Sequence, residues 1–310
     1  MHMNNDSTEP VYADEINLKE IFLAITDKKI FISALTGVFV LTSIIFSLML
    51  PKLWVSDALL SLSQDNGAGQ SSSSALGGMA SLAGIRMSSG SGGADKAELV
   101  IAAIHSRDFL KHLISFEEIL PRLMATKTFN EENNSDELDH RIYDASKLAW
   151  IDRTPTFFES YNQYRNTVST HYDPLGSGFI TITVKHRSPI FAQKFLNLII
   201  SEVNNILRDK DLIEAQASLE YLYTQLEDEY IQSEVRLSIT QLIESQLRTK
   251  MFANIRQDYA IYPLDTPYIP EQRFSPQRSK IVLLGFILGF MFSVICVLAR
   301  HYFLKSLKQN

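Results

Sequence analysis

Cysteine is nearly absent from this sequence of 310 residues, and its scarcity limits how the fold can be held together. The one cysteine, Cys296, lies within an apolar segment, so a domain in an oxidising compartment would contain no disulfide. Dense runs of Lys and Arg with interleaved aromatic residues are also missing, and the formal net charge is −6. We therefore expect a core held by packing alone and no nucleic-acid partner.

Motifs for catalysis, metals and nucleotides are missing as well. There is no G-x-x-x-x-G-K-[ST] phosphate loop, and the seven histidines form no H-x-x-x-H or H-E-x-x-H pair. The acidic stretch EDEYIQSE, residues 227–234, is typical of a solvated tip or bend rather than of an acid and base pair. The sequence predicts a non-enzyme without catalytic residues, cofactor or metal, although an acid–base site assembled from distant carboxylates stays open.

Two long apolar runs are the strongest positive signal. Residues 30–50 contain no charge, and at ~1.5 Å per residue they reach about 31 Å, enough to cross the hydrocarbon of a membrane. Residues 281–299 form a second run of this kind. The alternative for the first run is a cleaved signal peptide, but 29 residues precede it and no A-x-A site follows. We predict two transmembrane helices.

Flanking charge suggests the orientation of these two helices. Cations beside the outer ends of both runs favour termini in the cytoplasm. They are Lys28, Lys29, Arg300, Lys305 and Lys308. The opposite flanks carry cations too, namely Lys52, Arg278 and Lys280, so the margin is modest. Eleven residues follow the second run, which leaves no room for a signalling module or a kinase.

Between the runs, alternating patterns predict a sheet. WVSDALLSLS from Trp54 and FITITVK from Phe179 alternate apolar and polar residues, and YAIYPLD from Tyr259 reads as a return strand beside the first. Helical character marks 95–115, 135–151 and 154–167, the last with Thr154 and Pro155 as cap. The Gly/Ser-rich stretch 67–93 is either a disordered linker or a mobile loop with a docking helix at its centre.

A long helical run begins at the cap pair Ser188 and Pro189, after which no Gly or Pro occurs until Pro263. If 190–226 is one helix, it is about 55 Å long at ~1.5 Å per residue. Its a and d positions form a narrow seam suited to a neighbouring helix. The seam comprises Leu212, Ala215, Leu219, Leu222 and Leu226. We interpret it as an oligomer seam between identical chains arranged around an axis.

The segment entering the second run combines prolines and small residues. The prolines restrict φ and favour an extended, rigid strut; the motif comprises Pro267, Pro270, Ser275 and Pro276. Small residues four apart form a ridge that lets another helix approach closely, either within one chain or between chains. The ridge comprises Gly285, Gly289 and Ser293, and Ser33 with Gly37 offers a similar notch on the first run.

Together these patterns predict an α+β fold in which two transmembrane helices flank a domain with a membrane-proximal α/β base and a long projecting helix. The expected boundaries follow the chain. They are a tail at 1–29, a span at 30–50, the outer domain at 51–280, a span at 281–299 and a tail at 300–310. Within the outer domain, 54–187 and 254–266 form the base, 188–253 the helical stalk and 267–280 the strut.

The proline motif beside a span and the Gly285-x3-Gly289 pair resemble the Wzz polysaccharide co-polymerases, the O-antigen chain length determinants. Further similar stretches are spread along the chain: LGGMASLAGI from Leu76, SRDFL from Ser106, ASLEYLYTQL from Ala217 and EVRLSITQLIESQ from Glu234. One position departs, because the family usually has Lys after the Ser-Pro pair and this chain has Gln277. The nearest Lys, Lys280, follows three residues later.

The resemblance implies an inner-membrane protein with a periplasmic domain that contacts membrane lipid and assembles into a ring, commonly of eight protomers. Such a homo-oligomer would set how many repeat units a Wzy-type polymerase adds to an undecaprenyl-linked polysaccharide of lipopolysaccharide. The alternative is a structural or export accessory that forms a periplasmic assembly without length control.

Overall fold

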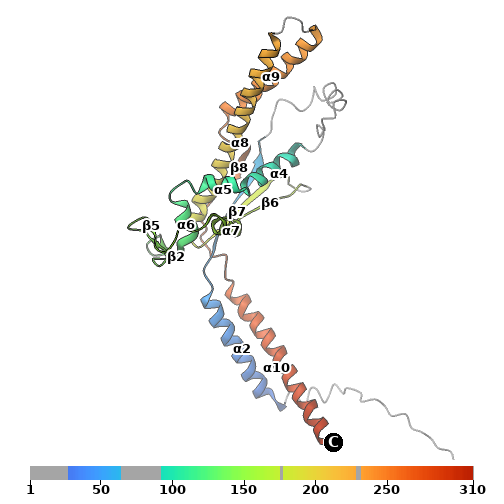
Figure 1. Ribbon diagram of the computed structural model, residues 1–310. Helices are drawn as coiled ribbons and strands as arrows, with labels where there is room; N and C mark the ends of the chain where they lie inside the picture. The colour runs from blue at the N-terminus through green and yellow to red at the C-terminus, as the bar shows by residue number, and fades with distance from the viewer. Residues whose placement is uncertain (1–26, 64–91, 175–176, 228–231, 310) are drawn as a thin grey trace, which may run out of the picture. The chain divides into compact units, whose positions relative to one another are not determined.

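The structure is a computed structural model that describes residues 27–63, 92–174, 177–227 and 232–309 (Figure 1). The chain divides into two units. Residues 1–51 and 275–310 form what we call the helix pair, and residues 52–274 form the α/β unit. Residues 1–26, and with them most of the expected N-terminal tail, lie outside the described residues, as does nearly all of the Gly/Ser-rich stretch 67–93.

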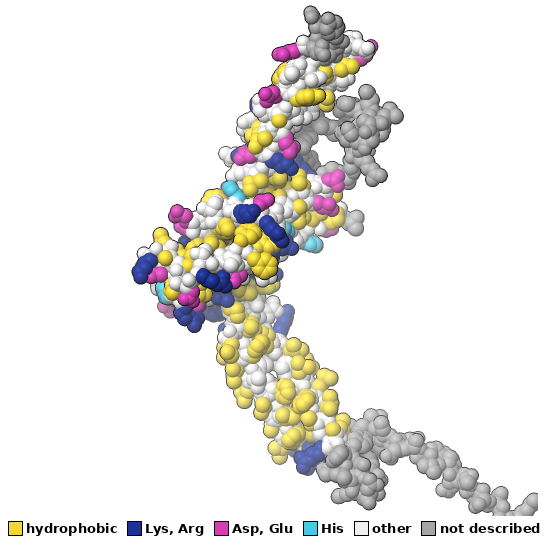
Figure 2. All heavy atoms as spheres, in the orientation of Figure 1, with side chains coloured by type: hydrophobic (Ala, Val, Ile, Leu, Met, Phe, Trp, Pro, Cys, Tyr) yellow, Lys and Arg dark blue, Asp and Glu magenta, His cyan; other side chains and the backbone are white. Residues whose placement is uncertain are grey.

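The helix pair consists of α2, Lys29–Met49, and α10, Arg278–Gln309, which pack against each other. Both helices are long and apolar enough to cross a membrane, and hydrophobic side chains cover their visible surface (Figure 2). The bounds of α2 agree with the predicted span within one residue. The helix α10 continues through most of the predicted tail 300–310, because no Gly or Pro interrupts it there.

A four-stranded antiparallel sheet forms the middle of the α/β unit, in the order β6-β7-β1-β8. The strands are β1 Trp54–Leu62, β6 Val168–Tyr172, β7 Ile180–His186 and β8 Ile261–Asp265. Alternation fixes which side is buried: Ala58, Leu60 and the apolar positions of β7 face the core. The prediction that the return strand lies beside the first strand is confirmed by the pairing of β8 with β1.

The core lies between this sheet and the first half of α8, Pro189–Leu226. Phe191, Phe195 and Ile199 of α8 are buried against the sheet. Shorter helices complete the cover. They are α4 Gly92–Ile104, α5 Arg107–Leu113, α6 Ile119–Ala125 and α7 Phe157–Thr167. The packing buries a contiguous apolar cluster without any disulfide among the described residues.

Helix caps explain where several elements begin. Ser188 Oγ accepts a hydrogen bond from the Phe191 N–H at 3.0 Å, with Pro189 in the first turn, as predicted. The predicted helix 95–115 is divided, because Ser106 caps a new helix, α5. The predicted cap of α7 was two residues early: Thr156 forms a capping box with Glu159.

The helix predicted over 135–151 is wrong. The segment forms hairpins, with β2 Thr126–Asn130 paired to β3 Ser135–Leu138, and β4 Tyr143–Asp144 paired to β5 Ala149–Trp150. Asp139 and Asp144 each accept a hydrogen bond from a backbone N–H two residues ahead. These local bonds compete with helical ones, and the Tyr143 and Trp150 rings pack edge to face at 5.1 Å.

The long helix is confirmed, and it has a partner in its own chain. The helix α8 spans 38 residues, and after residues 227–232 the helix α9, Ser233–Ile255, packs back along its second half. Figure 1 shows the two helices extending together beyond the sheet as the α8–α9 hairpin. The acidic stretch thus coincides with the reversal of the chain, although residues 228–231 lie outside the described part.

Candidate functional site

The glycine ridge of α10 lies directly against α2. A Cβ built on Gly285 would lie 2.5 Å from Ser43 Cβ, and one on Gly289 would lie 2.6 Å from Phe39 Cβ. Such separations are far below the ~3.5 to 4.0 Å of favourable carbon contact, so only glycine permits this approach. The third ridge residue, Ser293, is buried, with its Oγ 3.3 Å from Thr36 Oγ1. The ridge therefore packs within one chain.

The notch predicted on α2 does not meet the ridge. Ser33 is exposed, and a Cβ on Gly37 would meet nothing within 4 Å. Both residues line an open groove of about 510 Å³ between α2 and α10, with Phe286 and Phe290 on its other side. The notch is thus available to something other than α10.

The first two prolines of the motif belong to the α/β unit. Pro267 and Pro270 are buried, and the Pro267 carbonyl accepts a hydrogen bond from Gln193 Nε2 of α8 at 3.1 Å. Ser56 Oγ of β1 donates to the Tyr268 carbonyl at 2.8 Å. The predicted strut therefore begins as a segment docked on the sheet and on α8, whereas Ser275 and Pro276 are half-buried in the helix pair.

The two chain segments that lead to the helix pair are held together at the edge of the α/β unit. The Phe274 N–H donates to the Leu53 carbonyl at 2.9 Å. Glu131, from the turn after β2, accepts from Arg273 Nη2 at 2.6 Å and lies 3.6 Å from Lys52 Nζ. The hydrogen bond from Arg273 holds the pKa of Glu131 below its usual range.

The predicted oligomer seam is largely occupied by α9. Ala215 and Leu219 are buried, 1% and 3% exposed, on the part of α8 that faces α9, while Leu212, Leu222 and Leu226 are half-buried. The reasoning that the seam needs another chain is corrected here: the neighbouring helix comes from the same chain. The sequence patterns did not indicate which large apolar side chains stay exposed to solvent on the α8–α9 hairpin. They include Ile213, Tyr221, Tyr223, Val235, Leu237, Leu242, Leu247, Met251 and Ile255.

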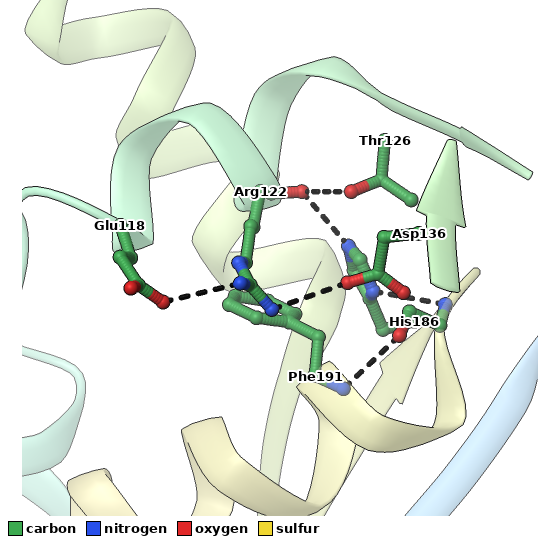
Figure 3. Close-up of polar contacts among 7 residues, drawn as sticks. Glu118, Arg122, Thr126, Asp136, His186 and Phe191 are labelled. Atoms are coloured by element: carbon green, nitrogen blue, oxygen red, sulfur yellow. Dashed lines mark hydrogen bonds and ion pairs between the residues drawn. The ribbon is translucent and has the colours of Figure 1, made fainter. Parts of the chain in front are cut away.

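A polar network joins α6, β3, β7 and α8 (Figure 3). Arg122 bridges Glu118 at 3.2 Å and Asp136 at 3.3 Å. Beneath it, His186 is buried: its Nε2 donates to the Arg122 carbonyl at 3.2 Å, and its Nδ1 accepts from the Ser188 N–H at 3.1 Å. This arrangement fits the neutral imidazole, and burial lowers the pKa of His186 to about 4.

A shallow groove of about 470 Å³ lies beside this network and combines apolar and charged walls. It is lined by Phe116, Glu117, Glu118, Ile119, Arg122, Phe191, Lys194 and Leu198. Arg122 is paired with both Glu118 and Asp136, so the network joins α6 and the β2–β3 hairpin to the end of β7 and the start of α8. Within the described residues no three His, Cys, Asp or Glu side chains gather as metal ligands.

Comparison with known proteins shows that about the first third of the chain is similar to one family. A model of the Wzz family, described as chain length determinant protein, matches residues 14–116. Residues 14–116 are therefore similar to the Wzz family, and we call them the Wzz segment. The resemblance noted from the sequence is thereby confirmed over these residues. A comparison with curated proteins returns no match.

Solved structures with some similarity include two co-polymerases. A full-length bacterial polysaccharide co-polymerase is 13% identical, with a TM-score of 0.39; the match covers 93% of this chain and 99% of that chain. A fragment of WzzB, a polysaccharide co-polymerase from Salmonella Typhimurium, is 16% identical, with a TM-score of 0.27, covering 73% of this chain and 100% of that chain. Because both TM-scores are low, we base no conclusion on them.

The Wzz segment places part of the candidate site within the recognised region. It includes α2 with Phe39 and Ser43, the strand β1, and the helices α4 and α5. The residues that Gly285 and Gly289 contact therefore belong to the Wzz segment, whereas the ridge, the proline motif and the α8–α9 hairpin follow it in the chain.

Proposed function

We propose that this chain is a non-enzymatic regulator of polysaccharide chain length in the bacterial inner membrane, with the α/β unit in the periplasm. The observation that carries the proposal is the Wzz match over residues 14–116, which spans α2, β1, α4 and α5. The α/β unit is flanked in the chain by two helices that are long and apolar enough to cross a membrane, as an anchored regulator requires.

The regulator acts as a homo-oligomeric scaffold, a ring in our proposal, beside a Wzy-type polymerase that extends an undecaprenyl-linked O-antigen. Support for lateral association comes from the α8–α9 hairpin. Ile213 is 71% exposed, Tyr221 64% and Leu237 62%, although all three are large and apolar. A run of such residues on a slender hairpin is the surface that a second copy would cover.

Association is tested on the full chain in detergent. The mass of the solubilised assembly, measured by light scattering, is expected to be a multiple of the 35.1 kDa chain. Ile213→Asp is expected to lower that mass, because a charge would enter the interface. Glu214→Gln, at the exposed neighbouring position, serves as the control and should leave the mass unchanged. A discrete monomer for the wild-type chain contradicts the scaffold.

Length control is tested in the strain that carries the gene. Deleting the gene should convert a modal lipopolysaccharide ladder on a gel into a broad, unregulated distribution, and the gene on a plasmid should restore the mode. An unchanged ladder refutes the proposal. Loss of surface polymer with unaltered lengths would instead favour an export accessory that forms a periplasmic assembly without measuring length.

A further inference from the structure

Cations gather where the α/β unit connects to the helix pair, on the side where positive charge is not expected. Lys52 lies three residues after the end of α2, and Arg273 five residues before the start of α10. At ~3.3 to 3.6 Å per residue, these spacers hold the two side chains within about 20 Å of the helix ends, however the two units are oriented. They remain close to the membrane surface if α2 and α10 cross it.

Three further cations lie beside these two. Lys185 of β7 has its Nζ 5.6 Å from the centre of the Phe274 ring, next to Arg273. Arg187 Nη1 donates to the Thr126 carbonyl of β2 at 3.0 Å, which brings it next to Lys127. The strand β2 is itself fixed beside Lys52, because the Phe129 and Trp54 rings meet edge to face at 6.3 Å. We call Lys52, Lys127, Lys185, Arg187 and Arg273 the connector cluster.

Carboxylates compensate this cluster only in part. Glu131 forms ion pairs with both Lys52 and Arg273. Asp139, which also attracts Lys127, is held in a two-pronged contact by Arg141. Lys127, Lys185 and Arg187 form no ion pair with any of the described residues. Like charges this close repel one another, so an anion placed among them gains energy from several cations at once.

We propose that the connector cluster binds the phosphate groups of anionic phospholipids at the membrane surface. Lys52 and Arg273 are separated from the two spans by only a few residues of chain, so lipid headgroups are the anions that the cluster meets at high local concentration if the spans cross a membrane. Phe274, 50% exposed among the cations, suits the same depth, because aromatic rings gather at the interface between hydrocarbon and water. Juxtamembrane Lys and Arg side chains bind anionic lipid surfaces through this attraction.

The test uses the full chain in dodecyl maltoside with equal amounts of phosphatidylglycerol and phosphatidylcholine that have identical acyl chains. Native mass spectrometry then counts the lipids retained on the protein. The wild-type chain is expected to retain phosphatidylglycerol preferentially. In the double variant Lys127→Gln/Lys185→Gln, the preference should fall about 5-fold for each cation removed, or about 30-fold at most.

Two further variants separate charge from folding. Neither the Lys127 nor the Lys185 ammonium donates a hydrogen bond to a described residue, so Lys127→Gln/Lys185→Gln should fold. Lys127→Arg/Lys185→Arg retains both charges and should keep the wild-type preference for phosphatidylglycerol. Lys210→Gln/Arg236→Gln removes two exposed cations from the α8–α9 hairpin and should also keep it. Melting temperatures of all variants, compared with that of the wild type, verify that each is folded.

The proposal is overturned if the wild-type chain shows no preference for phosphatidylglycerol, or if Lys127→Gln/Lys185→Gln retains the full preference. Displacement of the lipid by inorganic phosphate, but not by sodium chloride of the same ionic strength, would assign the cluster to free phosphate and also overturn it. The assay contains no glycan and no polymerase, so its outcome is independent of the proposed control of chain length.

Discussion

Asn204, a buried amide in the middle of α8, fixes the strand through which the chain returns towards the second span. Its Oδ1 accepts from the Ala260 N–H at 2.7 Å and the Ile261 N–H at 3.0 Å, and its Nδ2 donates to the Ile261 carbonyl at 2.9 Å. Replacing Asn204 by Leu removes the partner of three backbone groups while keeping the number and branching of the side-chain heavy atoms. Each unpaired buried group costs about 1 to 3 kcal/mol.

Because β8 is an edge strand, water can reach part of it, and we expect the lower end of that range, about 3 kcal/mol in total. Local opening of β8 should then become about 100-fold more frequent. Hydrogen exchange of the full chain, followed by mass spectrometry of peptides over 259–265, measures this directly. Peptides over β6, at the opposite edge of the sheet, provide an internal reference.

The adjacent residue offers a matched control. Asn205 is half-buried, and its Nδ2 donates only to Glu202 on the same helix. Asn205→Leu should therefore leave exchange in β8 at the wild-type rate. If Asn204→Leu also leaves exchange in β8 unchanged, or if both variants accelerate it equally, the amide does not hold the strand and the reasoning is refuted.

Three other substitutions and one control test the remaining contacts. Gly285→Leu should push α2 and α10 apart at a cost of about 1 to 3 kcal/mol and shift the lipopolysaccharide mode, whereas Gly37→Leu, facing the open groove, should leave the spin-label distance between the helices unchanged. Leu219→Asp should loosen α9 and lower the melting temperature by several degrees, since it buries a charge between the two helices; an unaltered melting temperature contradicts the packing. Burial lowers the pKa of His186 to about 4, so protonation favours the unfolded chain. The free energy of unfolding should therefore fall by about 3 kcal/mol between pH ~6.5 and pH 4. His186→Asn should make this fall smaller, as measured by melting curves at a series of pH values.

Patterns of neighbouring residues correctly predicted the elements whose formation depends on residues close together in the sequence. Alternation placed β1, β7 and β8, because a sheet with one buried face imposes a period of two. Ser188 and Pro189 marked the start of α8, because cap chemistry acts within one turn. The hairpins over 135–151 were missed, since their stability depends on side chains that bond to the backbone nearby and on one aromatic pair.

Contacts between segments that are distant in the sequence were harder to predict. The heptad spacing around Leu219 indicated a neighbouring helix, but we assigned that helix to another chain, whereas α9 of the same chain supplies it, because spacing alone does not identify the partner. The ridge on α10 was predicted, but whether its partner lay in the same chain or in another stayed open, because the residue that Gly289 accommodates is the large Phe39, which no pattern of small residues indicates. Asn204 was missed altogether, since a polar residue within a helix carries no sign that its partner lies 56 positions away.

These contacts also fix the path of the returning chain across the α/β unit before it continues to the second span. The helix α8 forms hydrogen bonds to the returning chain at two places: Asn204 bonds to the backbone of β8, and Gln193 donates to the Pro267 carbonyl. The two residues are 11 positions apart on one helix, about 16 Å at ~1.5 Å per residue, so α8 acts as a single stiff element towards the segment that continues to Arg273. The buried Pro267 and Pro270 restrict φ in the same segment, so these contacts and the two prolines together define one path for the chain across the α/β unit.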